Sequence, residues 1–104
     1  MGKDEPGRIE RKVVLTKHCE KGYKKLQESV KKSVEETIEE ISIRPESGYP
    51  LNDRRFKNTD LYSIHCGDFR IVYRFPHDAG ELEIWAIAHR SRVYEDLQRY
   101  MSVA

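Results

Sequence analysis

The chain has 104 residues, the length of one domain with a single modest core, and no apolar run in it approaches the roughly 20 residues that a membrane span requires. Its 19 Lys and Arg nearly balance its 18 Asp and Glu, so a net charge of +1 predicts no polyanionic partner, and any such binding must come from local clusters of charge. The start of the chain is charged where a signal peptide needs an apolar stretch, and we therefore expect a soluble, cytoplasmic protein.

The predicted elements begin after residues 1–10, where charges, two glycines and a proline leave little to bury and indicate a disordered tail before a folded domain at 11–104. The β-branched run at 11–16 is typical of a strand. Thr16 at its end can cap the helix that is predicted over 17–27.

A second helix is predicted more strongly over 28–43, because its apolar residues recur at helical spacing while Lys or Glu occupies most other positions. Usual helix lengths favour a hairpin of two helices over one bent helix that runs through both segments. The periodicity then stops, and 46–60 is predicted to be a long loop with a basic cluster of Arg54, Arg55 and Lys57.

Three strands are predicted over 61–66, 69–75 and 82–89, followed by a short amphipathic helix over 93–101. The strands are joined by short segments rich in turn-forming residues, which is typical of an antiparallel meander. The whole pattern, an N-terminal strand, a helical hairpin, a three-stranded meander and a short C-terminal helix, predicts an α+β fold.

The turn at Gly67-Asp68 is short enough to set the register of the first two strands of the meander. His65 then lies directly across from Arg70. One face of this hairpin is apolar and suited to cover by the helices, while the opposite face is mixed and carries the imidazole and the guanidinium.

Pairing Phe75 with Leu82 across the second turn sets the register of the third strand. The pairs expected on the open face are Trp85 with Val72, Ile87 with Arg70, and His89 with Asp68. The alternate residues Ile84, Ala86 and Ala88 would then fill the core.

Histidines, arginines and a tyrosine therefore converge on one predicted face without an acidic metal-ligand cluster. This combination is suited to binding and cleaving a phosphodiester without a metal. The candidate catalytic residues are His65, Arg70, His89, Arg90 and Tyr94. As alternatives, Arg70 could pair with a carboxylate and Tyr94 could simply pack the last helix against the sheet.

The two cysteines, Cys19 and Cys66, are isolated and lack CxxC spacing, which argues against a disulfide framework or a zinc site and fits a reducing compartment. Each follows a histidine, but neighbours point to opposite faces of a strand and diverge by about 100° on a helix. Such a pair cannot hold one ion, so we expect no metal and no cofactor.

The segment LYSIHCGDFRIVYRF, followed by ELEIWAIAHRSRVYEDL, resembles the RelE/ParE superfamily of toxins from bacterial and archaeal toxin-antitoxin pairs, over about 11–98. The resemblance implies a twisted antiparallel sheet with the helical hairpin on one face and a concave functional face on the other. In RelE-like members that face cleaves messenger RNA in the ribosomal A site. By resemblance, Arg70 and Arg90 would contact the phosphate, and Tyr94 would help to activate the 2′-hydroxyl.

Where RelE-like strands carry two lysines, this chain has Ser63 and His65, so the general base is not simply transferred. Some relatives use histidines, which makes His65 and His89 candidates. Residues on or beside the open face could hold RNA by charge or by stacking, although the basic loop could simply be solvated and the tryptophan could be a plain sheet aromatic. These are Arg54, Arg55, Lys57, Trp85 and Arg92.

A ribosome-dependent mRNA endoribonuclease, or mRNA interferase, is accordingly the first functional hypothesis. ParE-like members share the fold and block DNA gyrase without cutting RNA, and the near-neutral charge of this chain favours that alternative slightly. A third possibility is an inactive relative that retains only antitoxin binding. In all three cases the expected partner is a cognate antitoxin.

Overall fold

The computed structural model of the chain describes residues 11–51, 53–56, 58–76 and 80–103. The predicted disordered tail, 1–10, lies outside the described residues, as does Lys57. The helices and strands are β1 (Lys12–Leu15), α1 (Lys17–Lys24), α2 (Glu28–Ile43), β2 (Tyr49–Pro50), β3 (Tyr62–Cys66), β4 (Phe69–Arg74), β5 (Glu81–His89) and α3 (Val93–Val103), with short 3-10 helices at Pro45–Ser47 and Arg54–Phe56. No helix in the described part of the chain is both long and apolar enough to cross a bilayer.

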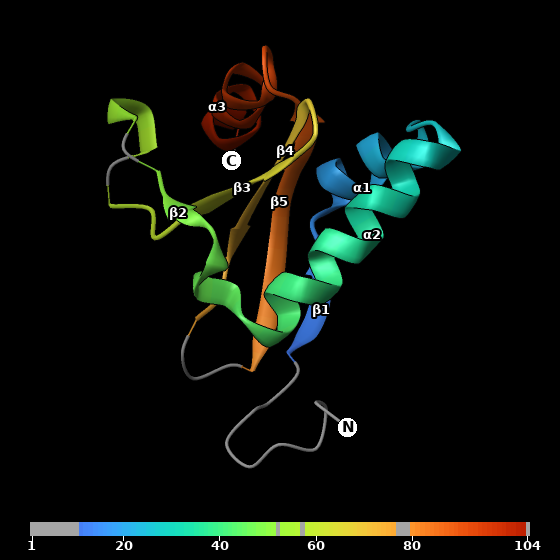
Figure 1. Ribbon diagram of the computed structural model, residues 1–104. Coiled ribbons are helices and arrows are strands. Elements are labelled where there is room, and N and C mark those ends of the chain that lie inside the picture. Colours follow the sequence, from blue (N-terminus) through green and yellow to red (C-terminus); the bar gives the residue numbers. More distant parts are fainter. Residues whose placement is uncertain (1–10, 52, 57, 77–79, 104) are drawn as a thin grey trace.

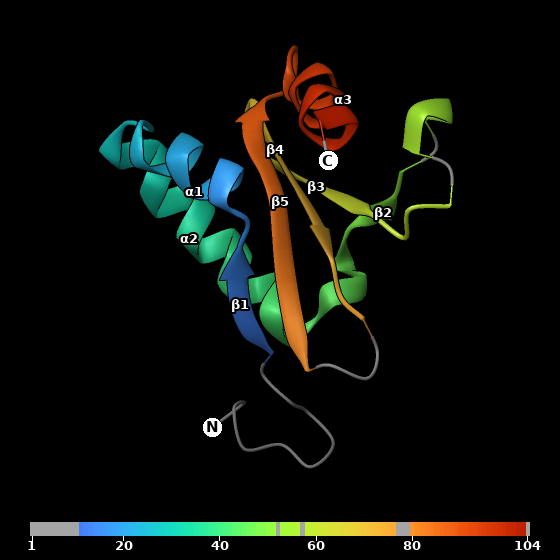
Figure 2. The ribbon, with the colours of Figure 1, turned by 180° about the vertical axis from the view of Figure 1, so that it is seen from behind.

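The strands form a single twisted sheet in the order β1-β5-β4-β3-β2. β1 is parallel to β5, and the other neighbours are antiparallel. Helices α1 and α2 cover one side of the sheet while α3 lies on the other, as Figures 1 and 2 show from opposite directions. The predicted α+β architecture is therefore confirmed, with β2 as an additional two-residue edge strand inside the predicted loop.

The first two helices form the predicted hairpin. α1 begins after Thr16, whose hydroxyl accepts a hydrogen bond from the backbone N–H of Cys19 at 3.2 Å. It ends at Lys24, and an extended Gln27 separates it from α2. The chain thus reverses between the helices instead of continuing as one bent rod.

The side of the sheet beneath α1 and α2 holds the larger core. Its buried residues are Cys19, Val34, Ile38, Ile41, Ile71, Tyr73, Leu82, Ile84 and Ile87. The helical stripe predicted from the spacing of Val34, Ile38 and Ile41 is the part of α2 that enters this core.

The side of the sheet beneath α3, called here the α3 face, holds a second, smaller core. Its buried residues are Phe56, Leu61, Val72, Ala86, Val93 and Leu97. This face is therefore partly covered, and only the part that α3 leaves uncovered is accessible to a ligand.

The register of the first hairpin is as predicted, and that of the second is not. Cys66 pairs with Phe69 and His65 with Arg70 across a turn in which Gly67 has a positive φ of 61°. In the second hairpin Arg74 pairs with Glu83 and Tyr73 with Ile84 as expected, but a β-bulge then interrupts the ladder between Tyr73 and Val72. The observed pairs beyond the bulge are Val72 with Ala86, Ile71 with Ile87, Arg70 with Ala88, and Phe69 with His89.

Trp85 is the extra residue of the bulge, so every side chain after it points to the face opposite to the predicted one. Ile87 lies in the core beneath α1 and α2, whereas Ala86 belongs to the core beneath α3. The predicted pairs of Trp85, Ile87 and His89 are accordingly wrong, and of the three residues expected to fill the main core only Ile84 does so.

Candidate functional site

The β3–β4 hairpin brings an imidazole and a guanidinium together on the α3 face. His65 and Arg70 are direct cross-strand partners, a position in which Cβ atoms lie about 4.5–5.5 Å apart. His65 is exposed and Arg70 is half-buried. The neighbour of Arg70 on β5 is Ala88.

Tyr94 joins this site from the first turn of α3. Its ring packs against Phe56 with centroids 6.2 Å apart, and its hydroxyl lies 3.3 Å from the hydroxyl oxygen of Ser63. Ser63 shares a face with His65 two residues along β3, about 7 Å away. The tyrosine therefore both packs α3 against the sheet and places a phenol within reach of a ligand held by His65 and Arg70.

The turn between β5 and α3 carries the two remaining arginines of the predicted site. The backbone N–H of Arg90 donates to the carbonyl of Asp68 at 2.8 Å, which holds this turn beside the β3–β4 turn. Arg90 and Arg92 are both exposed. Within the described part of the chain neither they nor Arg70 forms an ion pair, so three guanidinium groups are available at this end of the sheet.

His89 does not share the face of His65, because the bulge turns it toward α1. Its ring meets the edge of Phe69 with centroids 5.8 Å apart. Its Nδ1 lies 2.8 Å from the hydroxyl oxygen of Ser91 and accepts the backbone N–H of Ser91 at 3.2 Å. Since a backbone N–H can only donate, the neutral ring carries its proton on Nε2.

Trp85, predicted to contact RNA, is engaged by its own protein. The indole N–H donates to Glu83 at 3.2 Å, and the guanidinium of Arg74 lies 5.8 Å from the ring centroid. Arg74 and Glu83 also form an ion pair at 2.9 Å. The rings of Trp85 and of Tyr100 in α3 meet edge to face, with their centroids 6.3 Å apart. The structure thus gives this half-buried tryptophan a packing role at the bulge.

Only some of the basic side chains in the predicted loop lack an intramolecular ion pair among the described residues. Arg55 makes a two-pronged ion pair with Asp53, at 3.0 and 2.8 Å, and reaches Gln98 of α3 at 3.0 Å. The hydrogen bonds from Arg55 lower the pKa of Asp53 to about 2. Arg54 is exposed and forms no ion pair within the described residues, while Lys57 lies outside them.

The described residues contain no cluster of three or more His, Cys, Asp or Glu able to hold a metal ion. Cys19 is buried in the main core, and this burial raises the pKa of its thiol to about 12. Cys66 is half-buried against the same core, where Thr37 approaches its sulfur at 3.5 Å.

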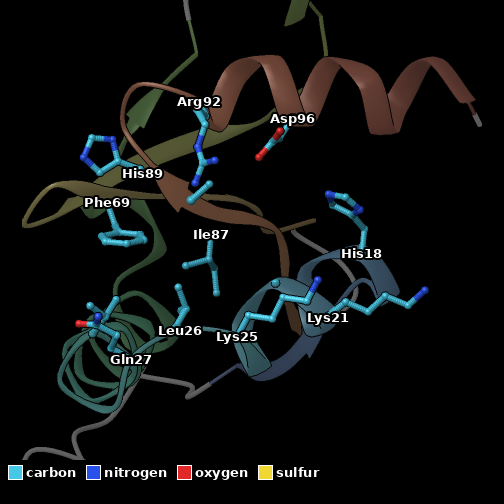
Figure 3. A pocket seen from close by; sticks show the side chains of 13 residues that line it. His18, Lys21, Lys25, Leu26, Gln27, Phe69, Ile87, His89, Arg92 and Asp96 are labelled. Carbon is cyan, nitrogen blue, oxygen red and sulfur yellow. The ribbon is translucent and has the colours of Figure 1, made fainter.

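The fold brings together one group of basic residues that was not predicted from the sequence. His18, Lys21 and Lys25 of the α1 segment line a pocket of about 700 Å³ together with His89 and Arg92 (Figure 3). Their spacing of three and four residues is the signal in the sequence, because it places them on one helical face.

Comparison with known proteins shows the family to which the chain belongs. Residues 13–94 match the model of the ParE toxin of type II toxin-antitoxin systems, parDE. Comparison with curated proteins gives no significant match.

Solved structures share the fold at low sequence identity. A mutant of the Escherichia coli toxin RelE in the free state superposes with a TM-score of 0.71 at 16% identity, covering 89% of this chain and 99% of that one. The toxin-antitoxin complex RelBE2 from Mycobacterium tuberculosis gives 0.69 at 22%, with 80% and 94% covered. The archaeal RelE-RelB complex from Pyrococcus horikoshii gives 0.62 at 19%, with 82% and 100% covered. With the family match spanning most of the chain, this protein belongs to the ParE toxin family of the RelE/ParE superfamily and is a toxin of a type II toxin-antitoxin system.

Proposed function

We propose that this toxin is a metal-independent endoribonuclease that cleaves messenger RNA on the ribosome. The observation that carries the proposal is the direct pairing of His65 with Arg70 on the α3 face, with the Tyr94 hydroxyl bonded to the same strand at Ser63. These groups can supply a proton acceptor, a phosphate ligand and a proton donor, which is the set that transesterification of RNA requires.

In the proposed reaction, Arg70 and Arg90 bind the non-bridging oxygens of the scissile phosphate and stabilise the charge that develops on them. His65 accepts the proton of the ribose 2′-hydroxyl, and the 2′-oxygen attacks phosphorus. The bond from phosphorus to the 5′-oxygen breaks, and the leaving oxygen takes a proton from the Tyr94 hydroxyl. The products are a 2′,3′-cyclic phosphate and a 5′-hydroxyl end.

The position of His89 narrows the assignment of the proton donor. With His65 as the base, the candidate residues for the donor are His89 and Tyr94. Because His89 lies on the other face of the sheet, beside Phe69, the proposed mechanism gives the role of donor to Tyr94. Its hydroxyl lies on the same face as the Arg70 guanidinium.

A ParE-like inhibitor of DNA gyrase is the second candidate function. Two observations favour it: the family model that matches is that of the ParE toxin, and the net charge is only +1. In that case the same arginines would form a contact surface and no bond would be broken. For either function a cognate antitoxin is the expected partner, as two of the similar structures are complexes of a toxin with its antitoxin.

The decisive experiment induces the protein in growing cells, maps new 5′-hydroxyl ends in translated messages and measures plasmid supercoiling in the same culture. We expect cleavage within codons and normal supercoiling. Arg70→Ala should reduce cleavage about 10²- to 10³-fold, the usual loss for one preorganised donor. Arg44→Ala, at an exposed arginine at the end of α2, is the matched control and should cleave normally.

Two results would overturn the proposal. Intact messages together with lost supercoiling would assign the gyrase function instead. Undiminished cleavage by a folded Arg70→Ala variant would show that the face identified here is not the active site. A circular dichroism melt of each variant separates loss of function from loss of fold.

A further inference from the structure

The pocket beside α1 is a second cationic site, which lies between α1 and the end of β5, whereas His65 and Arg70 pair on the α3 face. Its volume is about 700 Å³. Basic or titratable residues enter it from three segments of the chain: His18, Lys21 and Lys25 from α1 and its end, His89 from β5, and Arg92 from the following turn. Asp96 is the single acidic residue that lines it.

Basic and titratable nitrogen side chains outnumber acidic ones in this pocket. Lys21, Lys25 and Arg92 form no ion pair within the described residues. Figure 3 shows Arg92 entering from the β5–α3 side and Lys25 from the α1 side, with Leu26 and Ile87 between them. The pocket therefore offers positive charge around an apolar floor.

Two ring contacts define the borders of the pocket. His18 stacks on Tyr100 of α3 with centroids 4.7 Å apart, which joins α1 to α3 at one border. The rings of Phe69 and His89 meet at another border. Since Nδ1 of His89 is occupied by Ser91, its Nε2–H is the group that can donate to a ligand.

The turn between β5 and α3 connects this pocket with the candidate active site. Arg90 is held beside the β3–β4 turn, while Arg92, two residues later, lines the pocket. A polyanionic ligand strand that crosses this turn would contact both sites. That continuity favours a polyanionic strand over an isolated small anion or an acidic peptide.

We propose that this pocket binds the phosphate backbone of the RNA substrate outside the cleaved bond, with Lys21, Lys25 and Arg92 as phosphate ligands and the aromatic border as a place for a base to stack. The proposal rests on the proposed function, because it deepens the substrate recognition of the same enzyme. The bulge at Trp85 turns His89 away from the face of Arg70, so the proposed RNA would contact residues on both faces of the sheet.

The test measures RNA binding without cleavage. A fluorescent single-stranded RNA of about a dozen nucleotides, long enough to reach both sites, carries 2′-O-methyl groups throughout and so has no attacking hydroxyl. Its affinity for the full chain is measured by anisotropy over a range of salt concentrations. The variant is the double substitution Lys21→Ala, Lys25→Ala, both at exposed positions, and the matched control is Lys32→Ala on α2.

Each phosphate contact in single-stranded nucleic acid contributes about 0.7 to the slope of log affinity against log salt. The double variant should therefore lose about 1.4 from the magnitude of that slope and bind roughly 25-fold more weakly at 0.1 M salt. The Lys32→Ala control should match the unmodified chain. An unchanged slope and affinity in the double variant would overturn the proposal.

A second arm uses a fluorescent acidic amphipathic peptide rich in Glu and Leu. If the double variant loses binding of the peptide but keeps binding of the RNA, the pocket is a protein-docking groove and the proposal is wrong. If RNA binding falls as expected although the unmodified toxin leaves cleavable messages intact, the RNA site stands and the endoribonuclease proposal fails.

Discussion

Replacement of Tyr73 by Phe tests how the sheet positions the candidate site. Tyr73 is fully buried in β4, and its hydroxyl donates to the carbonyl of Pro45 at 2.5 Å and accepts the backbone N–H of Gly48 at 2.9 Å. These bonds hold the connection from α2 to β2. β2 in turn pairs with β3, where Tyr49 lies across from Ser63.

The expected loss of stability in Tyr73→Phe follows from the two hydrogen-bond partners that lose the hydroxyl. Both Gly48 and Pro45 are buried, so the N–H and the carbonyl lose their bond without gaining water. An unsatisfied buried group costs about 1–3 kcal/mol, so the two groups together give a loss of about 2–6 kcal/mol in the free energy of unfolding. For a chain of this size that corresponds to a fall of roughly 8 °C or more in Tm.

A double-mutant cycle with Gly48→Ala makes the test specific. A Cβ at Gly48 would collide first with the Tyr73 hydroxyl and next with the carbonyl oxygen of Ser63 at 2.8 Å. The penalty of Gly48→Ala should thus be smaller in the Tyr73→Phe background, where the first collision is gone. Thermal and urea unfolding of the four proteins measure it. A Tm within about 2 °C of the parent for Tyr73→Phe, or additive penalties, would refute this account.

Three further predictions concern the ionisable and reactive groups. Tyr94→Phe keeps the ring but removes the hydroxyl that contacts Ser63. The rate of cleavage should fall at least about 100-fold, with only a small loss of stability. Unchanged cleavage would exclude Tyr94 as the proton donor. Burial raises the pKa of Tyr73 from 10.0 to about 12, so the folded state holds this proton more tightly than the unfolded state. The contribution of this proton to the free energy of unfolding is fully present below pH 10 and should be lost as the pH rises toward 12. The Tyr73→Phe variant should lack this pH-dependent loss of stability in alkaline melts. Burial likewise raises the pKa of the Cys19 thiol to about 12. A thiol reagent at pH 8 should therefore modify Cys66 first and Cys19 only on unfolding. Rapid modification of both cysteines in the native state would contradict the buried position of Cys19.

Local chemistry was sufficient to predict most of the elements. Thr16 caps α1 as expected, and the stripe of Val34, Ile38 and Ile41 faces the core. The pairing of His65 with Arg70 was also predictable, because a two-residue turn leaves a hairpin one register. These features depend on neighbours in the sequence, and the information for them lies within a few residues.

The face of His89 was not predictable from its neighbours. The alternation from Ile84 to His89 continues without a glycine or proline to mark an extra residue, so a regular strand was the simplest expectation. Tertiary packing decides otherwise: Ile87 fills the core beneath α1 and α2, while Trp85 is held under α3 by Arg74. A bulge satisfies both contacts at once.

The sequence by itself determined the order of the elements, the register of the first hairpin and the set of cationic side chains at the end of the sheet. Only the tertiary structure decided how those side chains are divided, with His65 and Arg70 on one face of the sheet and His89 on the other. The physical reason is that one extra residue in a strand reverses every later side chain, and whether that residue is accommodated depends on the helices that pack against both faces.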